Sequence, residues 1–176
     1  KASRLGAAAI AGLLERTGLD PGAVDEVIMG CVVQAGLGQN PARKAAIWGG
    51  APTSVSAMTL NKVCGSGLRA VMSAVQAIRA GDIRCAIAGG MENMSQIPYA
   101  LFGARDGLRL GHQQLTDLLV HDGLWDVYRD YHMGMTAELV VDKYAVSRER
   151  QDAYAAESHR RAAAAAAAGK FAAEIV

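Results

Sequence analysis

Aromatic residues and cysteines are scarce in this chain of 176 residues, which has two Phe, two Trp, five Tyr and three Cys. Because Gly is frequent instead, with 20 residues, we expect close packing between backbones more than layers of aromatic rings. Cys31, Cys64 and Cys85 are odd in number and far apart, which argues against a disulfide framework and against a zinc site. This cysteine usage indicates a reducing compartment, and we expect a cytoplasmic protein without a bound metal.

An excess of one charge is also absent. The 18 Lys and Arg residues nearly balance the 17 Asp and Glu residues, which leaves a formal net charge of +1. A near-neutral chain has no electrostatic attraction for nucleic acid or for an anionic membrane surface. No apolar run approaches the roughly 18 residues of a membrane span, and no secretory signal is visible. We therefore expect an ordinary globular chain with neither nucleic acid nor membrane as a partner.

The stretch MTLNKVCGSGL at residues 58–68 contains Cys64, which is the main candidate for a functional residue in this chain. The apolar residues before Cys64 predict a buried strand that enters the motif. From Gly65 onward the spacing of apolar residues becomes helical, and Gly81 is typical of a residue that ends a helix. The residues with this helical spacing are Leu68, Val71, Met72, Val75 and Ile78.

Cys64 is therefore predicted at the point where a strand passes into the N-terminus of a helix. Free backbone N–H groups and the partial positive charge of a first helical turn favour the thiolate, which is the nucleophilic form of cysteine. Gly65 and Gly67 leave room for a substrate carbonyl, and the Cys64 N–H is placed to donate to a developing oxyanion. The alternative for Cys64 is a buried structural thiol. Cys31 and Cys85 fall within predicted strands and are interpreted as core residues.

Helices and strands are predicted to alternate along the first half of the chain, which indicates an α/β fold with a mostly parallel sheet flanked by helices. Because the carboxyl ends of parallel strands share one edge, Cys64 and residues 89–95 should lie together. Glu92 and Asn93 are either catalytic or, as we favour, bonded to the backbone at a turn. The predicted helices span 4–17, 41–48 and 65–80, and the predicted strands span 26–33, 55–63 and 83–89.

The second half of the chain departs from this alternation. Residues 95–130 mix Gly, charge and scattered Leu, which predicts an excursion from the sheet with short helices at 113–120 and 124–128. Two longer helices are predicted at 133–144 and 148–168. The first of these is expected to turn four residues inward, namely Met135, Leu139, Val140 and Tyr144.

Three separated segments resemble motifs of the thiolase family: NKVCGSGL at 61–68, GGMENMS at 89–95 and YHMGMTAE at 131–138. The resemblance extends along essentially the whole chain. It implies the layered thiolase fold, and it makes Cys64 the residue that carries the acyl group. It also implies three parts: an amino-terminal α/β domain at 1–94 without its first strand, the start of a coenzyme A-covering loop domain at 95–132, and remaining helices of the amino-terminal domain at 133–176.

The same resemblance implies that Leu124, His132 and Met133 contact coenzyme A or the acyl group. Without it, His132 would be interpreted as a surface or capping histidine. Coenzyme A thioesters would be the substrates, with no permanently bound cofactor. The family also implies a homodimer or a homotetramer.

The implied reaction is acyl transfer through an acyl-cysteine on Cys64, followed by attack of the α-carbanion of a second thioester. Ala137, which precedes Glu138, favours the type that condenses two acetyl-CoA molecules to acetoacetyl-CoA or catalyses the reverse thiolysis. Three alternatives stay open. They are a longer-chain 3-ketoacyl-CoA thiolase, a ketoacyl synthase, and a non-catalytic lipid-carrier or scaffold relative.

Parts of the thiolase pattern are missing from this sequence. It has no GHP histidine motif, no second Cys-Gly motif and no strand before Arg4, and it begins with Lys1 instead of Met. We therefore expect a fragment that is truncated before the carboxyl-terminal domain. We predict that the chain alone has no thiolase turnover, and that it is poorly soluble because its sheet lacks a strand and its partner domain.

Overall fold

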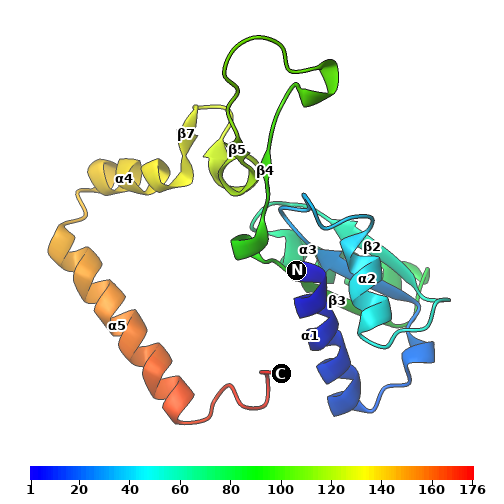
Figure 1. Cartoon of the computed structure of the whole chain (residues 1–176). Coiled ribbons are helices and arrows are strands. Elements are labelled where there is room, and N and C mark those ends of the chain that lie inside the picture. The colour runs from blue at the N-terminus through cyan, green and yellow to red at the C-terminus, as the bar shows by residue number, and fades with distance from the viewer. The chain divides into compact units, whose positions relative to one another are not determined.

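The computed structural model describes residues 1–176, which form two compact units, Lys1–Leu124 and Trp125–Val176. Figure 1 labels the main elements. The α-helices are α1 (Ala2–Thr17), α2 (Pro41–Trp48), α3 (Ser66–Ala80), α4 (Met133–Tyr144) and α5 (Arg148–Ala167). The strands are β1 (Glu26–Gly30), β2 (Ser56–Leu60), β3 (Ala86–Gly90), β4 (Tyr99–Ala100), β5 (Thr116–Asp117), β6 (Trp125–Asp126) and β7 (Tyr131–His132). Short helical turns are η1 (Pro21–Ala23), η2 (Met94–Gln96), η3 (Ala104–Asp106) and η4 (Val120–Leu124).

The first unit is built on a parallel three-stranded sheet in the order β2-β1-β3. In its register, Val27 of β1 is level with Ala57 of β2 and with Ile87 of β3. Because parallel strands need crossover connections, α2 lies between β1 and β2 in the chain, and α3 lies between β2 and β3. The predicted α/β fold with a parallel sheet is confirmed. β1 ends at Gly30 and not at residue 33, because the N–H groups of Val32 and Val33 bond to the Glu92 side chain instead of a neighbouring strand.

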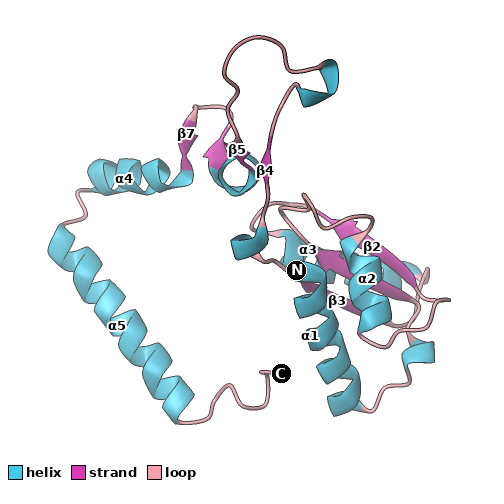
Figure 2. Ribbon diagram, in the orientation of Figure 1, coloured by secondary structure: helices cyan, strands magenta, loops and turns pink.

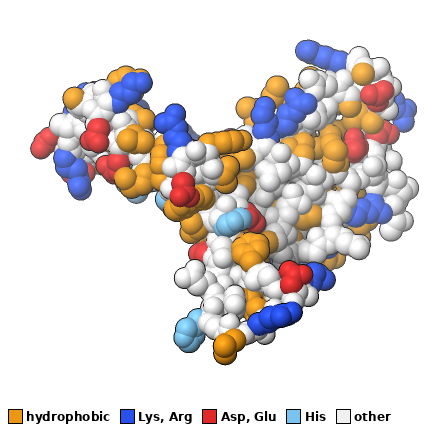
Figure 3. Space-filling view, turned by 90° about the horizontal axis from the view of Figure 1, so that it is seen from above, with side chains coloured by type: hydrophobic (Ala, Val, Ile, Leu, Met, Phe, Trp, Pro, Cys, Tyr) orange, Lys and Arg blue, Asp and Glu red, His pale blue; other side chains and the backbone are white.

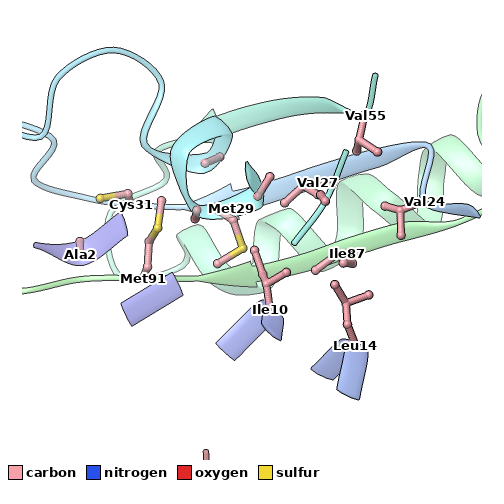
Figure 4. Close-up of a cluster of buried hydrophobic side chains, with 14 of the residues drawn as sticks. Ala2, Ile10, Leu14, Val24, Val27, Met29, Cys31, Val55, Ile87 and Met91 are labelled. Atoms are coloured by element: carbon pink, nitrogen blue, oxygen red, sulfur yellow. The ribbon is translucent and has the colours of Figure 1, made fainter. Parts of the chain in front are cut away.

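Helices cover both faces of this sheet, because successive residues of a strand point to opposite sides. Val27 and Met29 of β1 belong to the larger hydrophobic cluster, which includes Ile10 of α1 and residues of α2. Figure 4 shows this cluster, with side chains of α1 directed towards the strands. Ile28 points to the other face, where it clusters with Ala70 of α3. The sheet is therefore covered by α1 and α2 on one side and by α3 on the other.

The helix ends of the first unit follow local sequence signals. The Asn40 side chain caps α2 by accepting a hydrogen bond from the Arg43 N–H at 3.1 Å, and Pro41 occupies the first helical position. α1 ends before Gly18 and α3 before Gly81, whose φ angles of 63° and 82° are left-handed. These positions confirm the predicted start of α2 and the predicted ends of α1 and α3, whereas α1 begins at Ala2 and not at residue 4.

The burial of β2 and α3 differs from the simple pattern. The strand predicted as buried before Cys64 is an edge strand, and no residue of β2 is buried, so that prediction is wrong. α3 turns Ala70 and Ala74 to the sheet, since small side chains let a helix approach a strand closely. Figure 3 shows hydrophobic side chains at the molecular surface. On α3 the exposed ones are Leu68, Val71, Met72, Val75 and Ile78.

The excursion after the sheet contains little regular structure. β4 and β5 pair in antiparallel fashion, and the π-helix η4 ends this unit (Figure 2). The helix predicted at 113–120 is wrong, because Thr116 and Asp117 form β5 and the helical turn begins only after them. The Asp117 side chain accepts a hydrogen bond from the Leu119 N–H at 2.9 Å, a local bond that competes with helix formation upstream.

The second unit begins with the hairpin of β6 and β7, in which Trp125 pairs with His132. This hairpin replaces the helix predicted at 124–128. The cause is Asp126, whose side chain accepts hydrogen bonds from the N–H groups of Tyr128 and Arg129 and so stabilises a turn.

α4 and α5 confirm the two longer helices predicted for this region, although α5 ends at Ala167. Ser147 caps α5 by accepting a hydrogen bond from the Arg150 N–H at 3.4 Å. None of the helices in the chain combines the length and the hydrophobicity that crossing a membrane requires. The sequence predicted that one face of α4 would be buried. This prediction is wrong for the second unit, because α4 has no buried residue. The exposed residues are Met135, Leu139, Val140 and Tyr144.

Candidate active site

Cys64 lies in the turn between β2 and α3, and it is exposed. This position confirms the predicted junction between a strand and a helix N-terminus. Gly65 is the N-cap residue of α3, so Cys64 directly precedes the helix and is not part of its first turn. An accessible thiol excludes the alternative of a buried structural cysteine at this position.

Glycines bring the start of α3 against the ends of β1 and β3. A Cβ atom at Gly30 would lie 2.4 Å from the carbonyl carbon of Ser66, which is too close for any side chain. A Cβ atom at Gly90 would lie 3.2 Å from the Cα of Gly67. The helix N-terminus reaches the strand ends because side chains are absent there, and this places Cys64 at the carboxyl edge of the sheet.

The residue before the cysteine has an unusual backbone. Val63 has a φ angle of 47°, in the left-handed region, which costs an L-residue roughly 1–2 kcal/mol. Its N–H donates to the Asn61 side chain at 2.8 Å, and its carbonyl accepts from the Ser66 hydroxyl at 2.6 Å. Strained residues that neighbours hold in place are typical of functional sites.

Two hollows in the surface meet at Cys64. One measures about 340 Å³ and includes three glycines in its lining, and the other measures about 130 Å³ and is almost wholly apolar. Val32, Val63, Cys64 and Glu92 line both. The rest of the larger hollow consists of Gly30, Cys31, Ser66, Gly67, Gly90 and Met91, and the rest of the smaller consists of Val33, Met94, Leu119, Gly123 and Leu124. A nucleophile that two mostly apolar hollows share suits a small acyl group.

Of the other residues expected to contact substrate, the structure places Leu124 in the same hollow as Cys64. It lies at the end of η4, where a Cβ atom at Gly123 would be 3.2 Å from Val33 Cγ2. This close approach holds η4 against the segment that follows β1. Leu124 and Cys64 therefore share one apolar wall although they are far apart in sequence.

His132 and Met133 belong to the second unit, at the start of α4. His132 is the N-cap residue, and its Nδ1 accepts a hydrogen bond from the Gly134 N–H at 2.9 Å. This bond agrees with the capping alternative for His132 and leaves its Nε2 edge for other partners. Met133 is 39% exposed. The contacts of both residues with coenzyme A stay a prediction.

Glu92 has the structural role that we favoured. Its carboxylate accepts hydrogen bonds from the N–H groups of Val32 at 2.7 Å and Val33 at 3.3 Å. Beside it, Cys31 is 1% exposed, and burial, reinforced by the charge of Glu92, raises the pKa of its thiol to about 12. Cys31 is therefore a core thiol, as predicted, whereas Cys85 is half-buried at the margin of the core.

Sequence reasoning missed the residues that shape the turn around Cys64. Asn61 and Ser66 belong to residue types that often bond to nearby backbone, and their places on either side of the cysteine were an available signal. The left-handed backbone of Val63 had no signal, because β-branched residues avoid that conformation. No group of three or more His, Cys, Asp or Glu side chains is arranged to hold a metal ion.

Comparison with known proteins gives a consistent family. The family model described as "Thiolase, N-terminal domain" matches residues 1–176. The chain is 59% identical over 174 residues to an acetyl-CoA acetyltransferase of Pseudomonas aeruginosa and 57% identical over 175 residues to one of Cupriavidus necator, covering 99% of this chain and 44% of each relative. It is 51% identical over 172 residues to a probable acetyl-CoA acyltransferase of Staphylococcus aureus, covering 98% and 44% respectively. The chain thus spans less than half the length of these relatives.

Proposed function

This chain belongs to the thiolase family, and we propose that it is the amino-terminal part of an acetyl-CoA C-acetyltransferase. The reaction is the condensation of two acetyl-CoA molecules to acetoacetyl-CoA and coenzyme A, or the reverse thiolytic cleavage. The observation that carries the proposal is the exposed Cys64 at the meeting point of two hollows. The names of relatives at 59% and 57% identity support the choice of acetyl-CoA.

Cys64 performs the first half of the reaction. Its Sγ attacks the carbonyl carbon of acetyl-CoA, a carbon–sulfur bond forms to Cys64, and the bond to the coenzyme sulfur breaks. The coenzyme leaves as a thiol with the proton that the cysteine gave up. The glycine-lined hollow admits the thioester, and the Cys64 N–H donates to the oxyanion that develops on its carbonyl.

The second half forms the carbon–carbon bond. The α-carbon of a second acetyl-CoA loses a proton to a base outside this chain, attacks the acetyl carbonyl and releases Cys64. Leu124 contributes the apolar wall beside the acetyl group, and His132 and Met133 contact the pantetheine arm. These three roles follow from the family motifs, together with the place of Leu124 in the hollow at Cys64.

The remaining features of this proposal come from the family and the composition. Coenzyme A thioesters are the small-molecule partners, the protein is a cytoplasmic homodimer or homotetramer, and residues 95–132 begin the loop domain that covers coenzyme A. The family resemblance assigns the base, the activating histidine and the second oxyanion hole to the carboxyl-terminal portion, and this chain spans 44% of the length of such a relative.

The test uses the full-length protein, meaning this chain joined to the carboxyl-terminal portion that its relatives carry. Wild type, Cys64→Ala and the control Cys85→Ala are incubated with acetoacetyl-CoA and coenzyme A. We expect acetyl-CoA from wild type and C85A, none from C64A, and an acetyl adduct on Cys64 in mass spectra. Turnover by C64A contradicts the proposal. The 176-residue chain alone is expected to be inactive.

A longer-chain 3-ketoacyl-CoA thiolase is the second candidate. The similarity to a probable acetyl-CoA acyltransferase and the apolar hollow beside Cys64 favour it. Initial rates on acetoacetyl-CoA and on longer 3-ketoacyl-CoA substrates decide between the two. A non-catalytic relative is contradicted if, in the full-length protein, iodoacetamide alkylates Cys64 well before Cys31 and Cys85.

A further inference from the structure

We infer that Asn61 and Ser66 are positioning residues, which aim the Cys64 thiol by fixing the backbone of Val63. This inference rests on the proposed function, because it assigns a role in acyl transfer to two residues that do not touch the acyl group. Four observations carry it: the dihedral angle of Val63, the two side-chain clamps, and the packing around Ser66.

The direction of the Cys64 side chain depends on the residue before it. Val63 is the only β-branched residue of the chain with a positive φ angle, 47°. A left-handed residue reverses the local course of the backbone, so the next residue projects in a direction that extended or helical backbone would not give. Relaxation of Val63 to an ordinary conformation would therefore move Sγ away from the position where the two hollows meet.

Ser66 clamps Val63 from the helix side. Its hydroxyl accepts a hydrogen bond from the Lys62 N–H at 2.8 Å and donates one to the Val63 carbonyl at 2.6 Å. One hydroxyl thus joins the Asn61–Lys62 peptide to the Val63–Cys64 peptide, and so holds the backbone on both sides of the Lys62–Val63 pair. The backbone adds a weaker constraint of the same kind, since the Ser66 N–H donates to the Val63 carbonyl at 3.0 Å.

Asn61 clamps Val63 from the strand side. Its Oδ1 accepts a hydrogen bond from the Val63 N–H at 2.8 Å, and its Nδ2 donates to the Val32 carbonyl at 3.1 Å. The second bond ties the turn to the segment after β1, which lines both hollows. Asn61 therefore fixes Val63 relative to the walls of the site as well as fixing its conformation.

Ser66 is buried and lies against the end of β1. Ser66 is 3% exposed, and its Cβ would lie 2.7 Å from a Cβ atom added at Gly30. Asn61 is exposed, so its removal tests the same clamp without disturbing the core.

The experiment compares full-length wild type with Ser66→Ala, Asn61→Ala and Asn61→Asp. Ser3→Ala is the matched control, because Ser3 is 1% exposed and its hydroxyl has no hydrogen-bond partner. Three quantities are measured: the rate of Cys64 alkylation by iodoacetamide, kcat and KM for acetoacetyl-CoA cleavage, and the thermal midpoint.

We expect S66A and N61A to lower kcat by about 10- to 100-fold with KM unchanged, because misplacement of a reacting atom acts on the chemical step. The alkylation rate of Cys64 by iodoacetamide should fall in the same two variants. N61D keeps the acceptor for the Val63 N–H but loses the donor to the Val32 carbonyl, so it recovers only part of the loss. S3A matches wild type. If S66A does not fold, the exposed Asn61 variants decide the question.

Folded S66A or N61A with wild-type kcat and alkylation rate, even at a lowered thermal midpoint, overturns the inference and leaves an ordinary structural role. A failure of the proposed function looks different. In that case wild type shows no thiolysis, while the alkylation rate of Cys64 still depends on Ser66 and Asn61.

Discussion

The Glu92 carboxylate lies 2.7 Å from the Val32 backbone nitrogen and joins the segments that follow β3 and β1. It also accepts a hydrogen bond from the Val33 N–H, so one side chain satisfies two backbone donors where the sheet ladder has ended. Both segments line the hollows beside Cys64. The shape of the site therefore depends on a carboxylate whose hydrogen bonds go to the backbone of another segment.

Replacement of Glu92 tests this role. Glu92→Ala leaves two N–H groups without an acceptor, and we expect a loss of about 1–3 kcal/mol in the free energy of unfolding. Glu92→Gln keeps an oxygen acceptor and should lose less. Thermal unfolding of the two full-length variants measures the difference. Equal midpoints for E92A and wild type would contradict the assignment.

Cys31 predicts a pH dependence of stability. Its pKa is raised from 9.0 to about 12 in the folded chain, so between these values the unfolded chain releases a proton that the folded chain keeps. The stabilisation is complete below pH 9 and is lost as the pH rises towards 12, by up to about 1.4 kcal/mol per pH unit. Cys31→Ala removes this loss. Thermal midpoints of wild type and C31A are measured between pH 8 and pH 11 at roughly half-unit steps, and the slopes of midpoint against pH are compared. Equal slopes for the two proteins would contradict this role of Cys31.

Gly30 is expected to tolerate no side chain. Gly30→Ala places a Cβ atom 2.4 Å from the Ser66 carbonyl carbon, and the start of α3 has to move. We expect a loss of about 1–3 kcal/mol or more in stability and a strong loss of thiolysis. Gly89→Ala is the matched control, because its Cβ atom would meet Met29 Sδ at 3.6 Å, an ordinary contact. Circular dichroism melting and the acetoacetyl-CoA assay compare both variants, and equal behaviour would count against the packing argument.

The end of α4 offers a stabilising substitution. Ala145 is exposed and follows the helix with φ 49° and ψ 48°, a left-handed conformation that Gly adopts without strain. Ala145→Gly should raise the free energy of unfolding by up to about 1 kcal/mol. Ala155→Gly, inside α5, should lower it by about 1 kcal/mol. Thermal midpoints of the two variants should therefore shift in opposite directions, and a lowered midpoint for A145G would refute the prediction.

The exposed apolar residues of α3 should limit the solubility of the 176-residue chain. Val71 and Val75 are each 42% exposed and lie four residues apart on one helix face. Val71→Glu with Val75→Lys replaces them by an ion pair and should increase the soluble yield without loss of helicity. Ala155→Glu with His159→Lys, on the polar helix α5, should change little. The soluble fraction after centrifugation, with a far-ultraviolet spectrum, provides the measurement.

Local signals in the sequence were enough to predict the five α-helices and the three strands of the parallel sheet. Asn40 before Pro41, Gly18 and Gly81 each mark a helix end by a preference that acts within a few residues. The alternation of helices and strands indicated a parallel sheet, and a parallel sheet places the turn at Cys64 on its carboxyl edge. The same local reasoning failed at Asp117 and Asp126, where side chains bond to nearby backbone and replace predicted helix with strand or turn.

The features that make the site depend on segments distant in the chain, and no local pattern encodes them. Three such features arise only when strands, helices and η4 pack together. They are the close approach of Gly30 to Ser66, the wall that Leu124 shares with Cys64, and the burial of Ala70 in place of Leu68. Residue types and periodicity report which structure a short segment prefers, so Cys64 and its place between a strand and a helix could be predicted from the sequence. The direction of its thiol and the walls around it were not, because they are set by contacts between surfaces that meet only in the folded chain.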